Sequence, residues 1–121
     1  MIKISGTIIT FNEEKNIGRC IESMIPVCDE IIVLDSLSTD KTKEICQKYD
    51  VVFKSQSFLG YVDQKNKAAS YASFDFILNI DADEVLSSEL QKNIIKVKNG
   101  NLGSLTAFKL SRKTRYVDKW I

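Results

Sequence analysis

Short apolar, β-branched runs alternate with amphipathic helical patterns along this chain, and the early runs are apolar at consecutive positions. The runs predict strands at residues 3–10, 30–34, 51–54, 74–80 and 105–110. Strands that are apolar on both faces are typical of parallel sheets, which right-handed crossovers cover with helices on both sides. The sequence therefore predicts an α/β fold, with a mostly parallel sheet flanked by helices.

Caps and helix breakers between these runs mark the helices. Asn12 is a favourable N-cap for the first helix, and Glu13 and Glu14 suit the positive end of its dipole. Further helices are expected after the caps at 38–40, around 62–72 and over 86–97, where Asn99-Gly100 ends the last one. The basic and aromatic segment 112–121 fits none of these patterns.

Composition limits the classes of function. The 121 residues suffice for one domain with its own core, and 44% hydrophobic with 27% charged residues is an ordinary soluble composition. A net charge of +1 gives no reason to expect nucleic acid as a partner. No apolar run approaches the roughly 18 residues of a transmembrane segment, and no signal peptide precedes the first strand. We therefore expect a cytoplasmic protein whose membrane association, if any, is peripheral and at the inner face.

The chain has no histidine and three cysteines, Cys20, Cys28 and Cys46. The cysteine spacing fits no zinc site, and the lack of histidine removes the usual neutral-pH general base. Cys20 and Cys46 lie on apolar helical faces, so we expect both to be small core residues.

The predicted strand at 74–80 ends in Asp81-Ala82-Asp83-Glu84, which places three carboxylates within four residues. Like charges crowded at a strand end repel each other unless a cation lies between them. Carboxylates at i and i+2 of an extended chain share one side, and Mg²⁺ and Mn²⁺ prefer such oxygen ligands. The alternative is a solvated acidic turn, which is the commoner role of an isolated Asp-x-Asp.

Two further polar clusters follow predicted strands, at residues 10–13 and 35–40. The carboxyl ends of parallel strands meet at one edge, where open α/β sheets bind ligands, so all three clusters should converge there. Such an edge suits a nucleoside diphosphate. Thr10, Asn12 and Asp35 offer hydrogen bonds to a base or ribose, and Lys65 is placed to reach the base or the phosphates.

Each of these residues also has a structural alternative. Asn12 suits the capping of the first helix, and Asp35 suits the capping of the turn before the second helix. Lys65, in a polar patch at 64–66, suits a solvated helix surface. Gly60 either lets a ligand approach or only makes a turn. The chain lacks the glycine-rich dinucleotide and P-loop motifs, so we expect a metal ion to neutralise the diphosphate.

Four segments, in order, resemble family 2 glycosyltransferases of the GT-A fold: IITFNEEKNI (8–17), VLDSLSTDKT (33–42), QKNKA (64–68) and LNIDADE (78–84). The nearest resemblance is to the branch around bacterial lipopolysaccharide-core β-1,4-glucosyltransferases. It implies an inverting, metal-dependent enzyme that transfers a sugar from a nucleotide-diphosphate donor, commonly a UDP-sugar. The implied acceptor is a glycan or a lipid-linked molecule in lipopolysaccharide or other cell-envelope polysaccharide biosynthesis.

By position, the resemblance places Thr10, Asn12 and Glu13 in the nucleotide pocket. It places Asp35 at the uracil and Lys65 beside the base.

Asp81 and Asp83 match the Asp-x-Asp motif of the family. The resemblance implies that Asp83 contacts Mg²⁺ or Mn²⁺ and that Asp81 contacts the ribose or the metal. Tyr116 and Trp120-Ile121 resemble the segment where the acceptor side begins in this branch.

Members of the family continue well beyond residue 121, and that continuation carries the acceptor pocket and the catalytic base. No residue of 1–121 matches the base. We therefore expect residues 1–121 to form a single nucleotide-sugar-binding domain, the donor half of a longer enzyme, and to self-associate through the apolar tail at Trp120-Ile121.

Other classes of protein remain as alternatives. A non-catalytic nucleotide-sugar-binding or interaction module agrees with the missing base. A sugar nucleotidyltransferase needs a glycine-rich basic loop after its first strand, and residues 13–16 match that poorly. A receiver domain needs an acidic pair after its first strand and a phosphorylatable aspartate in the middle of the chain, and Asp81 with Asp83 comes too late in the strand order for that.

Overall fold

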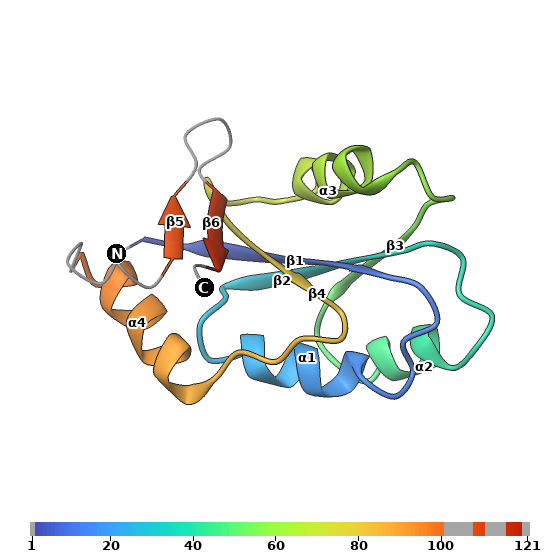
Figure 1. Cartoon of the computed structure of the whole chain (residues 1–121), viewed down its shortest axis with the longest axis horizontal. Helices are drawn as coiled ribbons and strands as arrows, with labels where there is room; N and C mark the ends of the chain where they lie inside the picture. The colour runs from blue at the N-terminus through green and yellow to red at the C-terminus, as the bar shows by residue number, and fades with distance from the viewer. Residues whose placement is uncertain (1, 101–107, 111–115, 120–121) are drawn as a thin grey trace.

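A computed structural model describes residues 2–100 and two short strands at 108–110 and 116–119 (Figure 1). The elements in chain order are β1 (Ile4–Thr10), α1 (Ile17–Met24), β2 (Glu30–Asp35), α2 (Thr42–Cys46), β3 (Val52–Ser55), α3 (Tyr61–Ser70), β4 (Phe76–Asp81), α4 (Ser88–Lys98), β5 (Phe108–Leu110) and β6 (Tyr116–Lys119). Strands and helices alternate over most of this order, as the sequence predicts.

The strands form one sheet in the order β3-β2-β1-β4-β6-β5. Every neighbouring pair is parallel except β5 and β6, which are antiparallel. Figure 1 shows α3 on one face of the sheet and α1, α2 and α4 on the other. The predicted α/β fold, a mostly parallel sheet flanked by helices, is confirmed.

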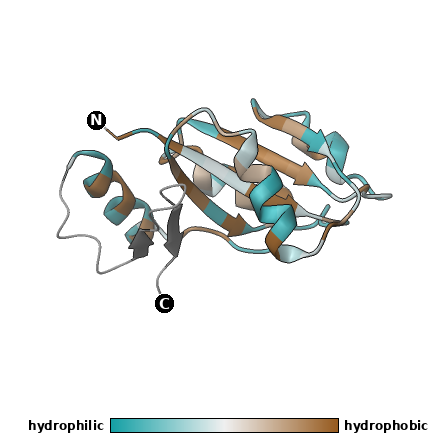
Figure 2. Cartoon of the chain, turned by 90° about the horizontal axis from the view of Figure 1, so that it is seen from above, coloured by the Kyte–Doolittle hydropathy of each residue, from teal (hydrophilic) through white to brown (hydrophobic). Residues whose placement is uncertain are grey.

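The core lies mainly between the sheet and the helices on the α1 side. Ile8, Ile21, Leu78 and Ile94 are almost completely buried and come from β1, α1, β4 and α4. Figure 2 shows the apolar residues concentrated along the strands, with hydrophilic residues over much of the helical surface. Cys20 and Cys46 are free and fully buried in this core, as predicted.

An ion pair joins the end of α4 to the beginning of β1. Lys98 Nζ lies 2.9 Å from Asp29 Oδ2 and donates to the carbonyl oxygen of Val27 at 2.9 Å. Asp29 Oδ2 also accepts the backbone N–H of Ile4 at 2.8 Å. This contact is far from the carboxyl ends of the strands, so it contributes to the stability of the fold and not to a site there.

The prediction that Asn12 caps the first helix is wrong. The helix begins four residues after Glu13, at Ile17, with Asn16 at its N-cap position. Asn12 has a φ of 50°, and its Oδ1 accepts the backbone N–H groups of Thr39 at 2.8 Å and Asp40 at 3.3 Å. Asn12 therefore caps a loop that is distant in sequence, which local helix signals cannot reveal.

Smaller differences occur at other element ends. The second helix is only five residues long, so Tyr49 follows it instead of belonging to it. The fourth helix ends as predicted, because Gly100 adopts a φ of 90° and donates to the carbonyl oxygen of Val97. The unassigned segment 112–121 contains β6, whereas Trp120-Ile121 lies outside the described residues. None of the helices in the described part of the chain is long and apolar enough to cross a membrane.

Candidate functional site

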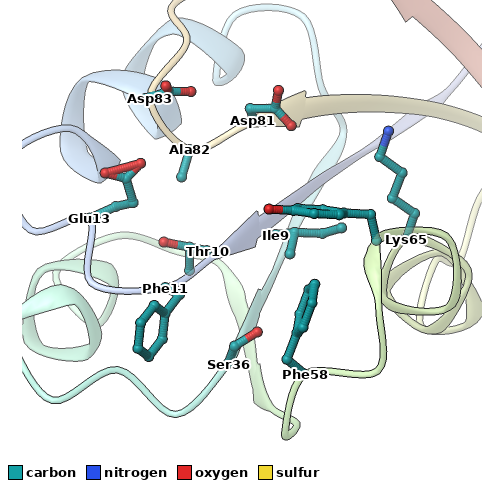
Figure 3. Close-up of a pocket in the computed structure, with 11 residues that line it drawn as sticks. Ile9, Thr10, Phe11, Glu13, Ser36, Phe58, Lys65, Asp81, Ala82 and Asp83 are labelled. Carbon is teal, nitrogen blue, oxygen red and sulfur yellow. The ribbon is translucent and has the colours of Figure 1, made fainter.

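A cleft of about 790 Å³ lies where the carboxyl ends of β1, β2 and β4 meet the beginning of α3 (Figure 3). Its walls consist of Ile9, Thr10, Phe11, Glu13, Ser36, Phe58, Tyr61, Lys65, Asp81, Ala82 and Asp83. These residues come from all three predicted polar clusters and from the loop and helix that follow β3.

Parallel pairing brings these distant residues together. The register of β1 with β2 places Thr10 opposite Asp35, and that of β1 with β4 places Ile9 opposite Asp81. The three clusters therefore meet at one edge of the sheet, as predicted from the strand order.

Thr10 has a buried hydroxyl that faces this cleft. Its side chain is 3% exposed, and Oγ1 has no hydrogen-bond partner among the described residues. A buried polar group without a partner costs about 1–3 kcal/mol, so native proteins rarely retain one without a function. A ligand atom in the cleft is the natural partner for this hydroxyl.

The acidic turn after β4 presents two carboxylates to the cleft. Asp81 and Asp83 are exposed, whereas Ala82 between them is buried, so the two aspartates share one side as predicted. Figure 3 shows both carboxylates on the same side of the cleft. Glu84 closes the turn, because its N–H donates to Asp81 O at 2.9 Å and its Oε1 accepts the Asp81 N–H at 3.1 Å.

The donor set of this turn fits a cation that is shared with a ligand. No group of three or more His, Cys, Asp or Glu side chains suited to a metal occurs among residues 2–100, and within this range the turn offers the carboxylates of Asp81 and Asp83 as candidate ligands. Two carboxylates are hard oxygen ligands, and Mg²⁺ typically binds through one or two carboxylates plus waters and phosphate oxygens. The pair therefore suits a divalent ion that bound phosphates also ligate.

Cys20 supports the acidic turn from α1. Its Sγ donates to the carbonyl oxygen of Asp81 at 3.5 Å. Burial, together with the charges of Glu84 and Asp81, raises the pKa of the Cys20 thiol to about 12. The thiol is therefore protonated at neutral pH and acts as a structural donor.

Lys65 and Glu13 line opposite sides of the cleft (Figure 3). Lys65 is exposed on the first half of α3, where its long side chain reaches toward the end of β4. Glu13 is half-buried, and its backbone N–H donates to Thr42 Oγ1 at 2.9 Å. Both predicted residues are thus present at the cleft.

Asn12 and Asp35 do not line the cleft, although their neighbours Phe11, Glu13 and Ser36 do. Asp35 is 3% exposed and accepts hydrogen bonds from Ser38 N at 2.8 Å and Ser38 Oγ at 2.5 Å. Asn12 is held by the same loop through Ser38 Oγ, which accepts its backbone N–H at 2.7 Å. The contacts of Asp35 match its turn-capping alternative, whereas Asn12 holds a distant loop and does not cap the first helix. The contact of either residue with a nucleotide stays a prediction.

The sequence analysis missed an aromatic wall formed by Phe58 and Tyr61. Their ring centroids lie 5.1 Å apart in an edge-to-face arrangement, and both rings are largely exposed at the mouth of the cleft. The available signal was two aromatic residues on either side of Gly60. Gly60 itself has a φ of 95°, a conformation that L side chains rarely adopt, so the turn requires glycine.

The polar patch expected at residues 64–66 is only partly present. Lys65 and Asn66 are exposed, but Gln64 is fully buried beneath the cleft. The helical period places Gln64 on the side of α3 that faces the sheet, where an apolar residue is usual. Its amide is accommodated there by hydrogen bonds to Leu59 and Ser36 in the neighbouring loops.

The cleft has two chemically different ends. Figure 3 shows Phe11, Ser36 and Phe58 at one end and Asp81 and Asp83 at the other. One end offers aromatic faces and a hydroxyl group, which suits a planar heterocycle, whereas the other offers carboxylates, which suit a cation.

An α/β domain with an acid-edged cleft at the carboxyl ends of its strands has the architecture of the GT-A transferases. TarS of S. aureus, solved as residues 1–349 and also with UDP, superposes with a TM-score of 0.63 at 26% identity. The match covers 82% of this chain and 33% of TarS 1–349. Glucosyl-3-phosphoglycerate synthase of Mycobacterium tuberculosis, solved with Mn²⁺ and UDP, gives a TM-score of 0.60 at 28% identity over 67% of this chain and 33% of that one.

The sequence comparison defines the family. The chain belongs to glycosyl transferase family 2, whose family model matches residues 5–115. A glycosyltransferase of Rickettsia conorii is 49% identical over 92 residues, 76% of this chain and 33% of the relative. The lipopolysaccharide core biosynthesis glycosyltransferase LpsC of Rhizobium meliloti is 38% identical over 75% of this chain and 35% of its own. The chain thus spans about a third of the length of these relatives.

Proposed function

We propose that this chain binds a nucleotide-activated sugar together with Mg²⁺ or Mn²⁺, as the donor-binding domain of a family 2 sugar transferase. The observation that carries the proposal is the two-ended cleft, with an unpartnered buried hydroxyl at Thr10 between the aromatic end and the acidic end. A nucleoside diphosphate has the same order of groups, from a planar base through a ribose to a charged diphosphate.

The residues at the acidic end would hold the metal and the diphosphate. Asp81 and Asp83 would supply carboxylate ligands, and the bound ion would offset the negative charge that develops on the departing diphosphate. Lys65 adds a positive charge at the same cleft. The synthase structure in complex with Mn²⁺ and UDP supports the choice of both ligands.

The residues at the aromatic end would hold the nucleoside. Phe58 offers a ring face for stacking, and Thr10 and Ser36 offer hydroxyl groups. UDP in the TarS structure supports uracil as the base.

The acceptor in this proposal is a glycan or a lipid-linked molecule of the cell envelope. Support comes from the name of the relative LpsC, which places that protein in lipopolysaccharide core biosynthesis. Transfer would proceed by attack of an acceptor hydroxyl at the anomeric carbon, on the side opposite the departing diphosphate. The described residues at the cleft bind and orient the donor in this scheme.

Calorimetric titration tests the proposal. UDP, GDP, dTDP and the corresponding sugar nucleotides would each be titrated into the chain with Mn²⁺, with Mg²⁺ and with excess EDTA. We expect one nucleotide series to bind at least tenfold more tightly with metal than with EDTA, a difference of about 1.4 kcal/mol. Failure of every nucleotide to bind with either metal would refute it. Metal-dependent binding without sugar transfer or donor hydrolysis would favour the alternative of a non-catalytic nucleotide-sugar-binding module.

A further inference from the structure

The buried amide of Gln64 makes three hydrogen bonds beneath the aromatic end of the cleft. Its Oε1 accepts the backbone N–H of Leu59 at 3.1 Å. Its Nε2 donates to Ser36 Oγ at 3.1 Å and to the carbonyl oxygen of Gln56 at 3.5 Å. Gln64 is fully buried, so these contacts are shielded from water.

The two backbone partners fix which way the amide faces. A backbone N–H can only donate, so Leu59 requires the oxygen of Gln64. A carbonyl oxygen can only accept, so Gln56 requires the nitrogen. The amide nitrogen therefore faces Ser36, and the Ser36 hydroxyl has to accept that hydrogen bond.

An accepting hydroxyl group still has its own proton to donate. Among the described residues, Ser36 Oγ has one hydrogen bond, which it accepts from Gln64, so none of them accepts the hydroxyl proton. The Ser36 backbone N–H is a separate donor and bonds to Thr10 O at 2.9 Å. Figure 3 shows the Ser36 oxygen directed into the cleft, on the side of Phe58 and Phe11. The free O–H is thus at the end of the cleft assigned to the nucleoside.

We propose that Ser36 donates a hydrogen bond to an oxygen atom of the nucleoside, and that Gln64 is the positioning residue that reserves the Ser36 proton for it. This inference rests on the proposed function, because it requires a nucleoside at the aromatic end. The recognised chemistry is an oxygen acceptor, such as a base carbonyl or a ribose oxygen. A diphosphate without a nucleoside lies outside the reach of this donor, since the carboxylates are at the opposite end.

Gln64 also positions the aromatic wall. Its bond to Leu59 fixes the backbone next to Phe58, and the N–H of Gln56 at the start of the same loop donates to Asp35 O at 2.9 Å. The loop is therefore tied to the end of β2 before Phe58 and to Gln64 of α3 after it. The Gln64 side chain thus positions both Phe58, whose ring would stack on a base, and Ser36, whose hydroxyl would donate to that nucleoside.

The test compares UDP with inorganic pyrophosphate, both in the presence of Mn²⁺, by calorimetry on four variants of the chain. Ser36→Ala removes the donor. Gln64→Glu keeps the size of the side chain but presents a carboxylate that accepts the Ser36 proton itself. The double variant Ser36→Ala/Gln64→Glu completes a double-mutant cycle. Ser57→Ala is the matched control, because it makes the same chemical change at an exposed residue of the loop after β3 that does not line the cleft.

We expect Ser36→Ala and Gln64→Glu each to weaken UDP binding about three- to tenfold, the range for loss of one hydrogen bond. Pyrophosphate binding should change less than twofold, and the double variant should bind UDP no more weakly than Gln64→Glu alone. Thermal unfolding of each variant verifies that it is folded, and Ser36→Ala alone carries the test if Gln64→Glu does not fold.

Two results would overturn the inference while leaving the proposed function intact. One is UDP affinity of Ser36→Ala equal to that of Ser57→Ala. The other is an equal loss of UDP and pyrophosphate affinity, which would indicate a general structural role. Absence of nucleoside diphosphate binding by the unmodified chain would instead refute the proposed function, and the inference with it.

Discussion

The backbone N–H of Ser36 donates to the carbonyl oxygen of Thr10 at 2.9 Å, directly beneath the cleft. This bond extends the pairing of β1 and β2 to the first residue after β2. It places two hydroxyl side chains from distant parts of the sequence next to each other. Both have hydrogen-bonding capacity that no described residue uses, so both are suited to a ligand.

Replacement of Thr10 by valine should raise the stability of the ligand-free chain and lower its affinity for UDP. The Oγ1 atom of Thr10 is buried without a partner, so Thr10→Val removes an unsatisfied group and should stabilise the ligand-free chain by up to about 1 kcal/mol. The same change should weaken UDP binding several-fold, because the ligand loses a partner. Urea unfolding and calorimetry measure the two effects.

Thr42 provides the matched control for this experiment. It is also fully buried, but its Oγ1 donates to Asp40 Oδ1 at 2.6 Å and accepts the Glu13 N–H at 2.9 Å. Thr42→Val should therefore destabilise the chain by about 1–3 kcal/mol. A destabilisation of the same size in Thr10→Val would show that the Thr10 hydroxyl is satisfied within the protein.

Asp83→Ala should remove most of the metal-dependent part of nucleotide binding. We expect UDP affinity in Mn²⁺ to fall more than tenfold, or more than about 1.4 kcal/mol, while affinity in EDTA stays the same. Calorimetry in the two buffers measures the difference. Glu89→Ala, at an exposed position in the first turn of α4, is the control for a general change in charge. Unchanged Mn²⁺-dependent affinity in Asp83→Ala would exclude Asp83 as a metal ligand.

Asp35→Ala distinguishes the two roles of this buried carboxylate. Ser38 loses the acceptor for both its N–H and its hydroxyl group, so the free energy of unfolding should fall by about 1–3 kcal/mol. If Asp35 also contacts the base, UDP affinity should fall while pyrophosphate affinity is retained. A loss of stability with equal effects on UDP and pyrophosphate would leave only the turn-capping role.

Asp29 should make the stability of the fold depend on pH in the acidic range. Burial acts to raise the pKa of Asp29, but the hydrogen bonds from Lys98 and Ile4 and the charge of Lys98 outweigh it, so its pKa lies below the ordinary value. A lowered pKa in the folded state means that the stabilisation is fully present above the unfolded pKa of about 3.9. It is lost as the pH falls through the lower folded-state value.

Urea unfolding of Asp29→Asn between pH 2.5 and 6 measures this contribution. The variant should be less stable than the unmodified chain above pH of about 4, and the difference should shrink as the pH falls further. Asp50→Asn, at an exposed residue, is the control for the loss of one negative charge. A difference that is constant across the whole range would show that ionisation of Asp29 does not contribute.

The strand and helix order of this chain could be predicted because each element has a local signal. Ile17, Cys20 and Met24 have helical spacing and are all buried, and the apolar run before Asp35 is a buried strand. The acidic turn was also predictable, since residues two apart at the end of a strand share one side. Asp81 and Asp83 accordingly lie together on the cleft.

The roles of Asn12 and Gln64 were not predictable from local signals. Asn12 resembles a helix cap in sequence, yet its side chain accepts from Thr39 and Asp40 on another loop. Gln64 resembles a surface residue, yet its amide is buried between three segments. The partners of Asn12 lie far away in the sequence, and those of Gln64 lie partly across a turn and partly far away. Formation of the sheet brings these partners together, so local signals cannot reveal either role.

The sequence by itself determined the elements, their order and the chemical groups at the carboxyl ends of the strands, because hydrophobic periodicity and strand connection act locally along the chain. Only the tertiary structure decided which of these groups face the cleft. It turned Asp35 inward to Ser38, left the Thr10 hydroxyl without a partner among the described residues and added Phe58 to the wall. The physical reason is that side-chain direction and hydrogen-bond satisfaction depend on neighbours that strand pairing brings together, and those neighbours have no fixed spacing in the sequence.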